Sequence, residues 1–120
     1  MYPTGYSYGM EKRKKFYKTS DGKIPFDEWL EELDFQDSHK VLVRITRLML
    51  GNTSNCEPVG GGAHEVKMYH GPGYRVYFAN IDDNEIVILS GGSKKRQQKD
   101  IDKAISYLKD YKKKGKYAKK

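Results

Sequence analysis

The sequence contains little cysteine, proline and tryptophan, and it has no long uninterrupted hydrophobic segment. Cys56 is the only cysteine, so no disulfide can form within the chain, as expected in a reducing compartment. No apolar run approaches the roughly 18 residues that indicate a membrane-spanning helix. The first residues also lack the apolar core of a signal peptide, and we therefore expect a cytoplasmic protein without a membrane partner.

Sequence patterns for metal and phosphate binding are missing as well. His39, His64 and His70 are not spaced as metal ligands with one another or with Cys56. The glycine run at residues 60–62 lacks the preceding strand and the lysine of a P-loop. We therefore expect no metal and no other cofactor.

Positive charge is what the chain has in excess. Its 120 residues carry a formal net charge of +7. Residues 94–120 hold 12 Lys/Arg and 3 Asp/Glu, or +9, whereas residues 1–93 hold 11 and 13, or −2. A basic end attracts polyanions, nucleic acid first. For the extreme tail the alternative is a solvated lysine segment that only aids solubility.

The length fits one domain, which we assign to residues 11–111, between a flexible extension at residues 1–10 and a basic tail at residues 112–120. A strand is expected within residues 11–19. A first helix begins near Pro25, and a second, which Ser38 can cap, ends at Gly51. Turn-forming residues predict a loop over residues 52–63.

Three strands and a final helix follow this loop. The strands are predicted at residues 65–69, 74–79 and 85–90, and apolar spacing over residues 101–108 predicts the helix. The order β-α-α-β-β-β-α indicates an α+β fold. We expect a small antiparallel sheet packed against two N-terminal helices and a C-terminal helix.

Alternation along the first two of these strands predicts a charged face. Four apolar side chains should face the helices, and the residues between them should form an exposed patch on the opposite face: Glu65, Lys67, Arg75 and Tyr77. Arg75 suits bidentate phosphate binding, and Tyr69 and Tyr77 could stack on unpaired bases. Alternatively, these charges only pair with one another and protect the sheet from aggregation.

Several motifs together resemble the RelE/ParE superfamily of type II toxins, and most of all its HigB-like branch, the addiction module killer proteins. The similarity covers about residues 12–108. The motifs are Pro25-Phe26-x-x-Trp29-Leu30, Arg44-Ile45-x-Arg47-Leu48 with Gly51-Asn52, Gly62-x-x-Glu65, Gly71-Pro72-Gly73-Tyr74-Arg75-Val76-Tyr77-Phe78, and Gly91-Gly92-x-Lys94-x-x-Gln97-x-x-Asp100-Ile101.

The resemblance implies a RelE-like fold and a ribosome-dependent mRNA endoribonuclease that inhibits translation without a metal. The ribose 2′-hydroxyl would attack the neighbouring phosphate while the protein stabilises the transition state. The implied partners are the ribosome, mRNA and a cognate antitoxin, with DNA contacted only through the antitoxin. The implied catalytic residues are Arg75, Lys67, Glu65 and Lys94. From their charge and position on the sheet we add Lys95, Arg96, Tyr69 and Tyr77 as RNA-binding residues.

Two departures from the family pattern keep other interpretations open. Lys67 stands where arginine is usual, and Ser93 where aspartate is usual. A carboxylate is a weak base at neutral pH, so a purely electrostatic mechanism is a second interpretation of the site. A DNA gyrase inhibitor, or a degenerate module that only binds RNA or an antitoxin, remain alternatives to the nuclease.

Overall fold

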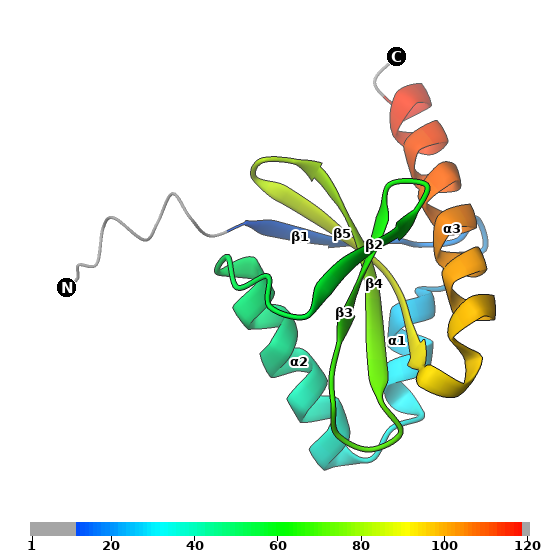
Figure 1. The fold of residues 1–120 in the computed structure, drawn as a ribbon. Coiled ribbons are helices and arrows are strands. Elements are labelled where there is room, and N and C mark those ends of the chain that lie inside the picture. The colour runs from blue at the N-terminus through cyan, green and yellow to red at the C-terminus, as the bar shows by residue number, and fades with distance from the viewer. Residues whose placement is uncertain (1–11, 119–120) are drawn as a thin grey trace.

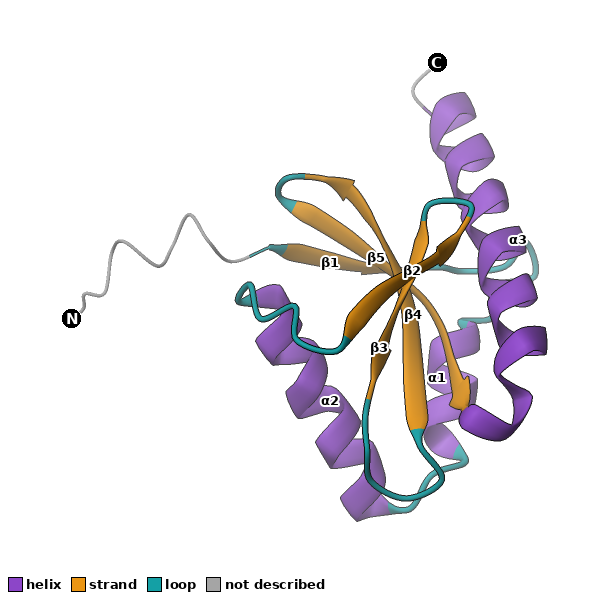
Figure 2. Ribbon diagram, viewed as in Figure 1, coloured by secondary structure: helices purple, strands orange, loops and turns teal. Residues whose placement is uncertain are grey.

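The computed structural model describes residues 12–118, and the extension expected at residues 1–10 lies outside them (Figure 1). No helix among the described residues is long and apolar enough to cross a bilayer. The fold is α+β, as expected (Figure 2). Its elements are β1 (Arg13–Phe16), α1 (Pro25–Glu31), α2 (Phe35–Met49), β2 (Cys56–Gly60), β3 (Ala63–Lys67), β4 (Tyr74–Asp82), β5 (Glu85–Ser93), the 3-10 turn η2 (Lys94–Arg96) and α3 (Gln97–Ala118).

The sheet is mixed, which corrects the expectation of a purely antiparallel one. Its strand order is β1-β5-β4-β3-β2, and β1 runs parallel to β5 while all other neighbours are antiparallel. The loop expected at residues 52–63 contains an additional strand, β2, which forms a hairpin with β3 through the glycine run. The sequence did not predict this strand because it contains Pro58, although a proline is tolerated at the edge of a sheet.

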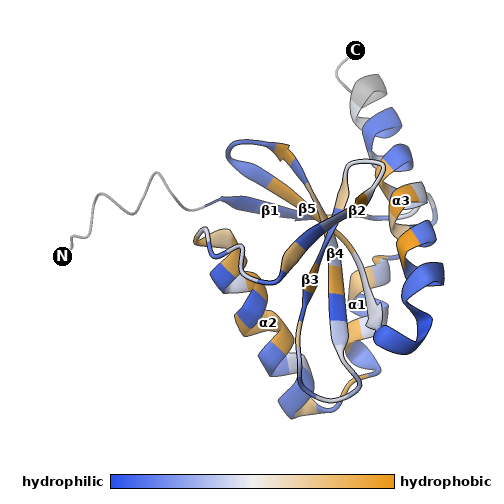
Figure 3. Cartoon of the chain, in the orientation of Figure 1, coloured by the Kyte–Doolittle hydropathy of each residue, from blue (hydrophilic) through white to orange (hydrophobic). Residues whose placement is uncertain are grey.

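Helices cover both faces of the sheet. Val66, Val76 and Ile88 point into a core with α1 and α2, whereas Tyr77 and Leu89 point into a second core with α3. Figure 1 shows α2 and α3 on opposite sides of the sheet, and Figure 3 shows hydrophobic and hydrophilic residues alternating along α2. The face expected to be exposed is therefore covered by α3 over its middle.

The helix starts follow local chemistry. Pro25 occupies the first turn of α1, together with the acidic Asp27 and Glu28. The N-cap of α2 is Asp34, whose carboxylate accepts the backbone N–H of Asp37 at 2.8 Å, and not Ser38 as expected. Helix α3 continues to Ala118, so most of the expected basic tail extends this helix.

Two consecutive glycines let both helical layers approach β5 closely. A Cβ at Gly91 would overlap the ring of Trp29 from α1, and one at Gly92 would overlap the carboxylate of Asp100 from α3. The Gly91-Gly92 pair thus fixes α1 and α3 against the end of the strand that leads into η2.

Candidate functional site

The charged residues singled out from the sequence gather on β3 and β4, beside the start of α3. Lys67 lies directly opposite Arg75, and Glu57 of β2 lies opposite Glu65. Like charges directly opposite each other destabilise a sheet, so this register requires compensation.

Diagonal contacts supply that compensation. Lys67 Nζ lies 3.2 Å from a Glu57 carboxylate oxygen and 4.0 Å from one of Glu65, and Arg75 Nε lies 3.8 Å from Glu65 Oε1. The four side chains form a chain of alternating sign across three strands. The structure therefore brings Glu65, Lys67 and Arg75 together, as the sequence predicted, but Glu65 and Arg75 are buried and do not form the exposed patch that was expected.

Arg75 is held from its other end by the hairpin turn. Its Nη1 donates a hydrogen bond of 2.7 Å to the carbonyl of Gly73, whose positive φ of 78° favours glycine. The backbone N–H of Lys94 donates to the same carbonyl at 2.9 Å. One peptide oxygen thus joins the guanidinium to the first residue of η2.

Glu65 is held by a residue of α3. The side-chain amide of Gln97, the first residue of α3, donates to both carboxylate oxygens at 3.0 and 3.1 Å. The side chain of Glu65 is only 3% exposed and that of Arg75 only 8%. A carboxylate with both oxygens engaged and two cations beside it is arranged to orient those cations.

Tyr77 corrects a prediction. It is fully buried in the core under α3, so in this structure it cannot stack on an unpaired base. Burial raises the pKa of its hydroxyl, and the nearby Glu65 and Asp100 raise that pKa further. Sequence alternation correctly placed Tyr77 on the face of Arg75, but it gave no information on what covers that face.

The other residues assigned to RNA binding lie at the surface. Tyr69 is 76% exposed in the segment that follows β3. Lys94, Lys95 and Arg96 are exposed in η2, next to the turn that holds Arg75. The start of η2 and the hairpin turn therefore meet at one site.

Sequence reasoning missed two supporting residues, Gln97 and Asp100. Both belong to the motif after Gly91-Gly92, and their spacing of three residues places them on one side of α3. Gln97 contacts Glu65, and Asp100 packs on Gly92 with its pKa raised by burial. In the described part of the chain, no three His, Cys, Asp or Glu side chains are grouped to hold a metal.

Comparison with known proteins finds a relative of this chain. No family model matches the sequence. An uncharacterized protein of Haemophilus influenzae strain Rd is 38% identical over 82 residues, which cover 68% of this chain and 83% of that protein. The chain therefore belongs to the same protein family as this Haemophilus influenzae protein.

Proposed function

We propose that the protein is the toxin of a type II toxin–antitoxin system, a cytoplasmic, ribosome-dependent mRNA endoribonuclease of the RelE/ParE superfamily. One observation carries the proposal. The two most specific motifs of the resemblance, Gly71-Pro72-Gly73-Tyr74-Arg75 and Gly91-Gly92-x-Lys94, meet at the carbonyl of Gly73. This carbonyl joins the guanidinium of Arg75 to the backbone of Lys94, which links the two segments in one frame.

Such a frame suits chemistry on a phosphodiester. The 2′-oxygen of the substrate ribose forms a bond to the neighbouring phosphorus, the bond to the 5′-oxygen breaks, and a 2′,3′-cyclic phosphate and a 5′-hydroxyl result. Negative charge builds up on the phosphate oxygens during this step, and a preorganised guanidinium stabilises it without having to move. We assign that role to Arg75, with Lys67 and Lys94 as further cations.

Glu65 takes a positioning role in this mechanism. Its side chain is only 3% exposed and Gln97 donates to both of its oxygens, so we do not assign it the proton of the attacking hydroxyl. Its carboxylate, 3.8 Å from Arg75 Nε, instead attracts the guanidinium and helps to hold it in place. The proton of the 2′-hydroxyl then leaves to solvent water, and the 5′-oxygen takes one from water. The site is accordingly an electrostatic one.

Primer extension on mRNA in a purified translation system, with and without ribosomes, tests the proposal. Wild type should produce cuts only when ribosomes are present. Arg75→Ala should abolish them while keeping the wild-type circular dichroism spectrum, and Arg75→Lys should restore only part of the cleavage because the planar fork is lost.

Arg13→Ala is the matched control, since Arg13 is an exposed arginine on β1, at the opposite end of the strand order from β2 and β3. It should cut as wild type does. No cuts from folded wild type that still arrests growth would refute the nuclease assignment. Binding to antitoxin or RNA without cleavage would then identify the degenerate module, in which the carboxylates merely neutralise Lys67 and Arg75.

A further inference from the structure

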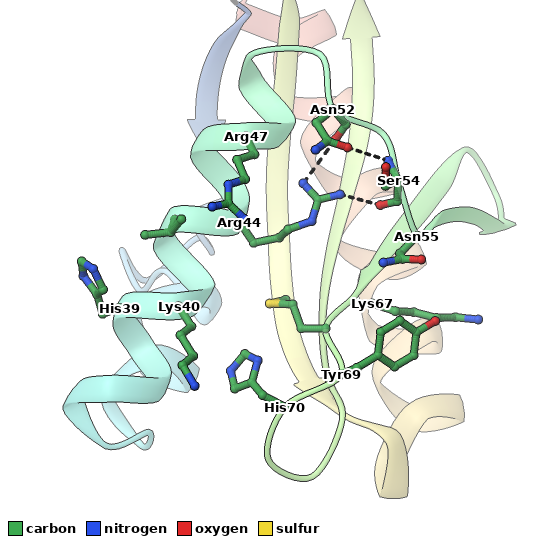
Figure 4. A pocket seen from close by; sticks show the side chains of 12 residues that line it. His39, Lys40, Arg44, Arg47, Asn52, Ser54, Asn55, Lys67, Tyr69 and His70 are labelled. Atoms are coloured by element: carbon green, nitrogen blue, oxygen red, sulfur yellow. Dashed lines mark hydrogen bonds between the residues drawn. The ribbon is translucent and has the colours of Figure 1, made fainter.

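A second basic surface lies in a groove beside α2, and of the residues assigned to the proposed chemistry only Lys67 lines it. The groove has a volume of about 490 Å³ and lies between α2 and the segment that leaves β3 (Figure 4). Lys40, Arg44 and Arg47 line it from α2, and Lys67 and His70 line it from the other side. No aspartate or glutamate is among its described lining residues.

The three cations of α2 form a row. They are spaced at i, i+4 and i+7, which puts them on one side of the helix, about one turn or 5–6 Å apart. Arg44 donates to the carbonyls of Asn52 and Ser54, which holds the loop without cancelling the positive charge. Lys40 and Arg47 are exposed, and neither is in a salt bridge with another described residue.

The row leads toward the candidate site through Lys67. This lysine lines the groove and is also the cross-strand neighbour of Arg75. Figure 4 shows its ammonium directed away from α2, whereas Lys40 extends from α2 in the direction of His70. Lys67 therefore lies at the border of the groove, with its ammonium on the side of its cross-strand neighbour Arg75. A chain of phosphates that contacts both Arg75 and the groove has to pass around the segment that leaves β3 at Lys67.

The remaining lining groups fit nucleic acid better than an acidic peptide. Tyr69 presents a 76% exposed ring on which an unpaired base can stack. The amides of Asn52 and Asn55 add donors and acceptors of the kind that read base edges. A row of cations one turn apart also matches successive phosphates better than a single anion.

We propose that this groove binds single-stranded RNA beside the cleavage site and holds the strand that continues from the scissile phosphate. The inference rests on the proposed function. It extends the part of the mRNA that the protein binds beyond the reacting nucleotides. Lys40 and Arg47 contact backbone phosphates, and Tyr69 stacks on one base. None of the three takes part in the chemical step.

Fluorescence anisotropy with a labelled single-stranded 2′-O-methyl oligoribonucleotide tests this binding, because that RNA lacks the nucleophile and stays intact. The full chain is compared with Lys40→Gln/Arg47→Gln and with Arg13→Gln/Lys14→Gln, a control that removes one lysine and one arginine from exposed positions of β1. The groove variant should lower the affinity roughly tenfold. It should also reduce the slope of log affinity against log salt by about 1.4, or about 0.7 per lost contact.

The control should keep the wild-type affinity and slope, and each groove substitution alone should reduce the slope by about 0.7. Tyr69→Ala should weaken binding with an unchanged slope. Equal slopes for the groove variant and the control would overturn the inference, as would adenosine monophosphate competing as well as the oligonucleotide. Neither result bears on the cleavage test with Arg75. If RNA binding depends on the groove but no mRNA is cut, only the nuclease assignment is refuted.

Discussion

Gly73 contributes no side chain to the candidate site, yet its carbonyl orients both Arg75 and the backbone of Lys94. At the residue scale, the site depends on such supporting groups as much as on the charges themselves. Buried hydrogen bonds to a charged group contribute more than neutral ones, because an unpaired buried charge is costly. Gln97, which donates to both oxygens of the nearly buried Glu65, is the clearest case.

Replacing Gln97 with leucine should therefore lower the free energy of unfolding by about 1.5–3 kcal/mol, the range for hydrogen bonds to charged groups. Urea denaturation measures the change. Gln98→Leu is the matched control, because Gln98 is exposed and bonds only Asp102 on the surface of α3, so it should stay within about 0.5 kcal/mol of wild type. Equal effects of the two substitutions would show that Gln97 does not support Glu65.

Two glycine-to-alanine substitutions should change the stability of the fold in opposite directions. Gly91→Ala should destabilise the fold by about 1–3 kcal/mol, because the added methyl group overlaps the ring of Trp29. Gly115→Ala, in α3 with no neighbouring atom near the new Cβ, should stabilise it by up to about 1 kcal/mol. Thermal unfolding of both variants checks the pair, and a Gly91→Ala protein as stable as wild type would contradict the close approach of α1.

At the scale of elements, the sequence predicted most of the fold and part of the site. Periodicity located α1, α2 and the three strands that carry Glu65, Arg75 and the Gly91-Gly92 pair. It missed β2, because an edge strand with Pro58 shows no apolar alternation, and it missed the parallel pairing of β1. Alternation identifies which residues share a face of the sheet, but it does not show which helix packs on that face. Tyr77 is buried because α3 covers it.

The contact between α3 and Tyr17, the residue after β1, predicts that the stability of the fold depends on pH in the acidic range. The hydroxyl of Tyr17 donates to Asp110 at 2.6 Å, and this hydrogen bond, followed by the contact with Lys114, lowers the pKa of the Asp110 carboxyl. A lowered folded-state pKa stabilises the fold above the unfolded value, about 3.9 for aspartate, and that stabilisation is lost as the pH falls through the folded pKa.

Tyr17→Phe should therefore lose less stability than wild type as the pH falls below about 4. Melting temperatures measured as a function of pH provide the comparison. Tyr107→Phe serves as the control, since its ring stacks on Tyr17 at 4.8 Å while the bond to Asp110 remains. A Tyr17→Phe protein with the full acid sensitivity of wild type would rule out this contact as its source.

At the scale of the whole molecule, positive charge comes from both halves of the chain. Sequence composition places the excess in residues 94–120, and η2 begins at the candidate site, where the backbone of Lys94 bonds Gly73. The first 93 residues carry a net charge of −2, yet α2 presents a second basic surface in the groove. Folding thus produces a local field that net charge does not reveal.

The most direct test of this account is the single-turnover rate of mRNA cleavage on ribosomes for wild type, Arg75→Ala and Glu65→Gln. An electrostatic site that depends on Arg75 predicts a loss of roughly 10²-fold or more for Arg75→Ala. It predicts a loss of less than about tenfold for Glu65→Gln, because a positioning residue does not take the proton, whereas a lost general base costs about 10²–10⁴-fold. Cleavage by Arg75→Ala at the wild-type rate would contradict the account.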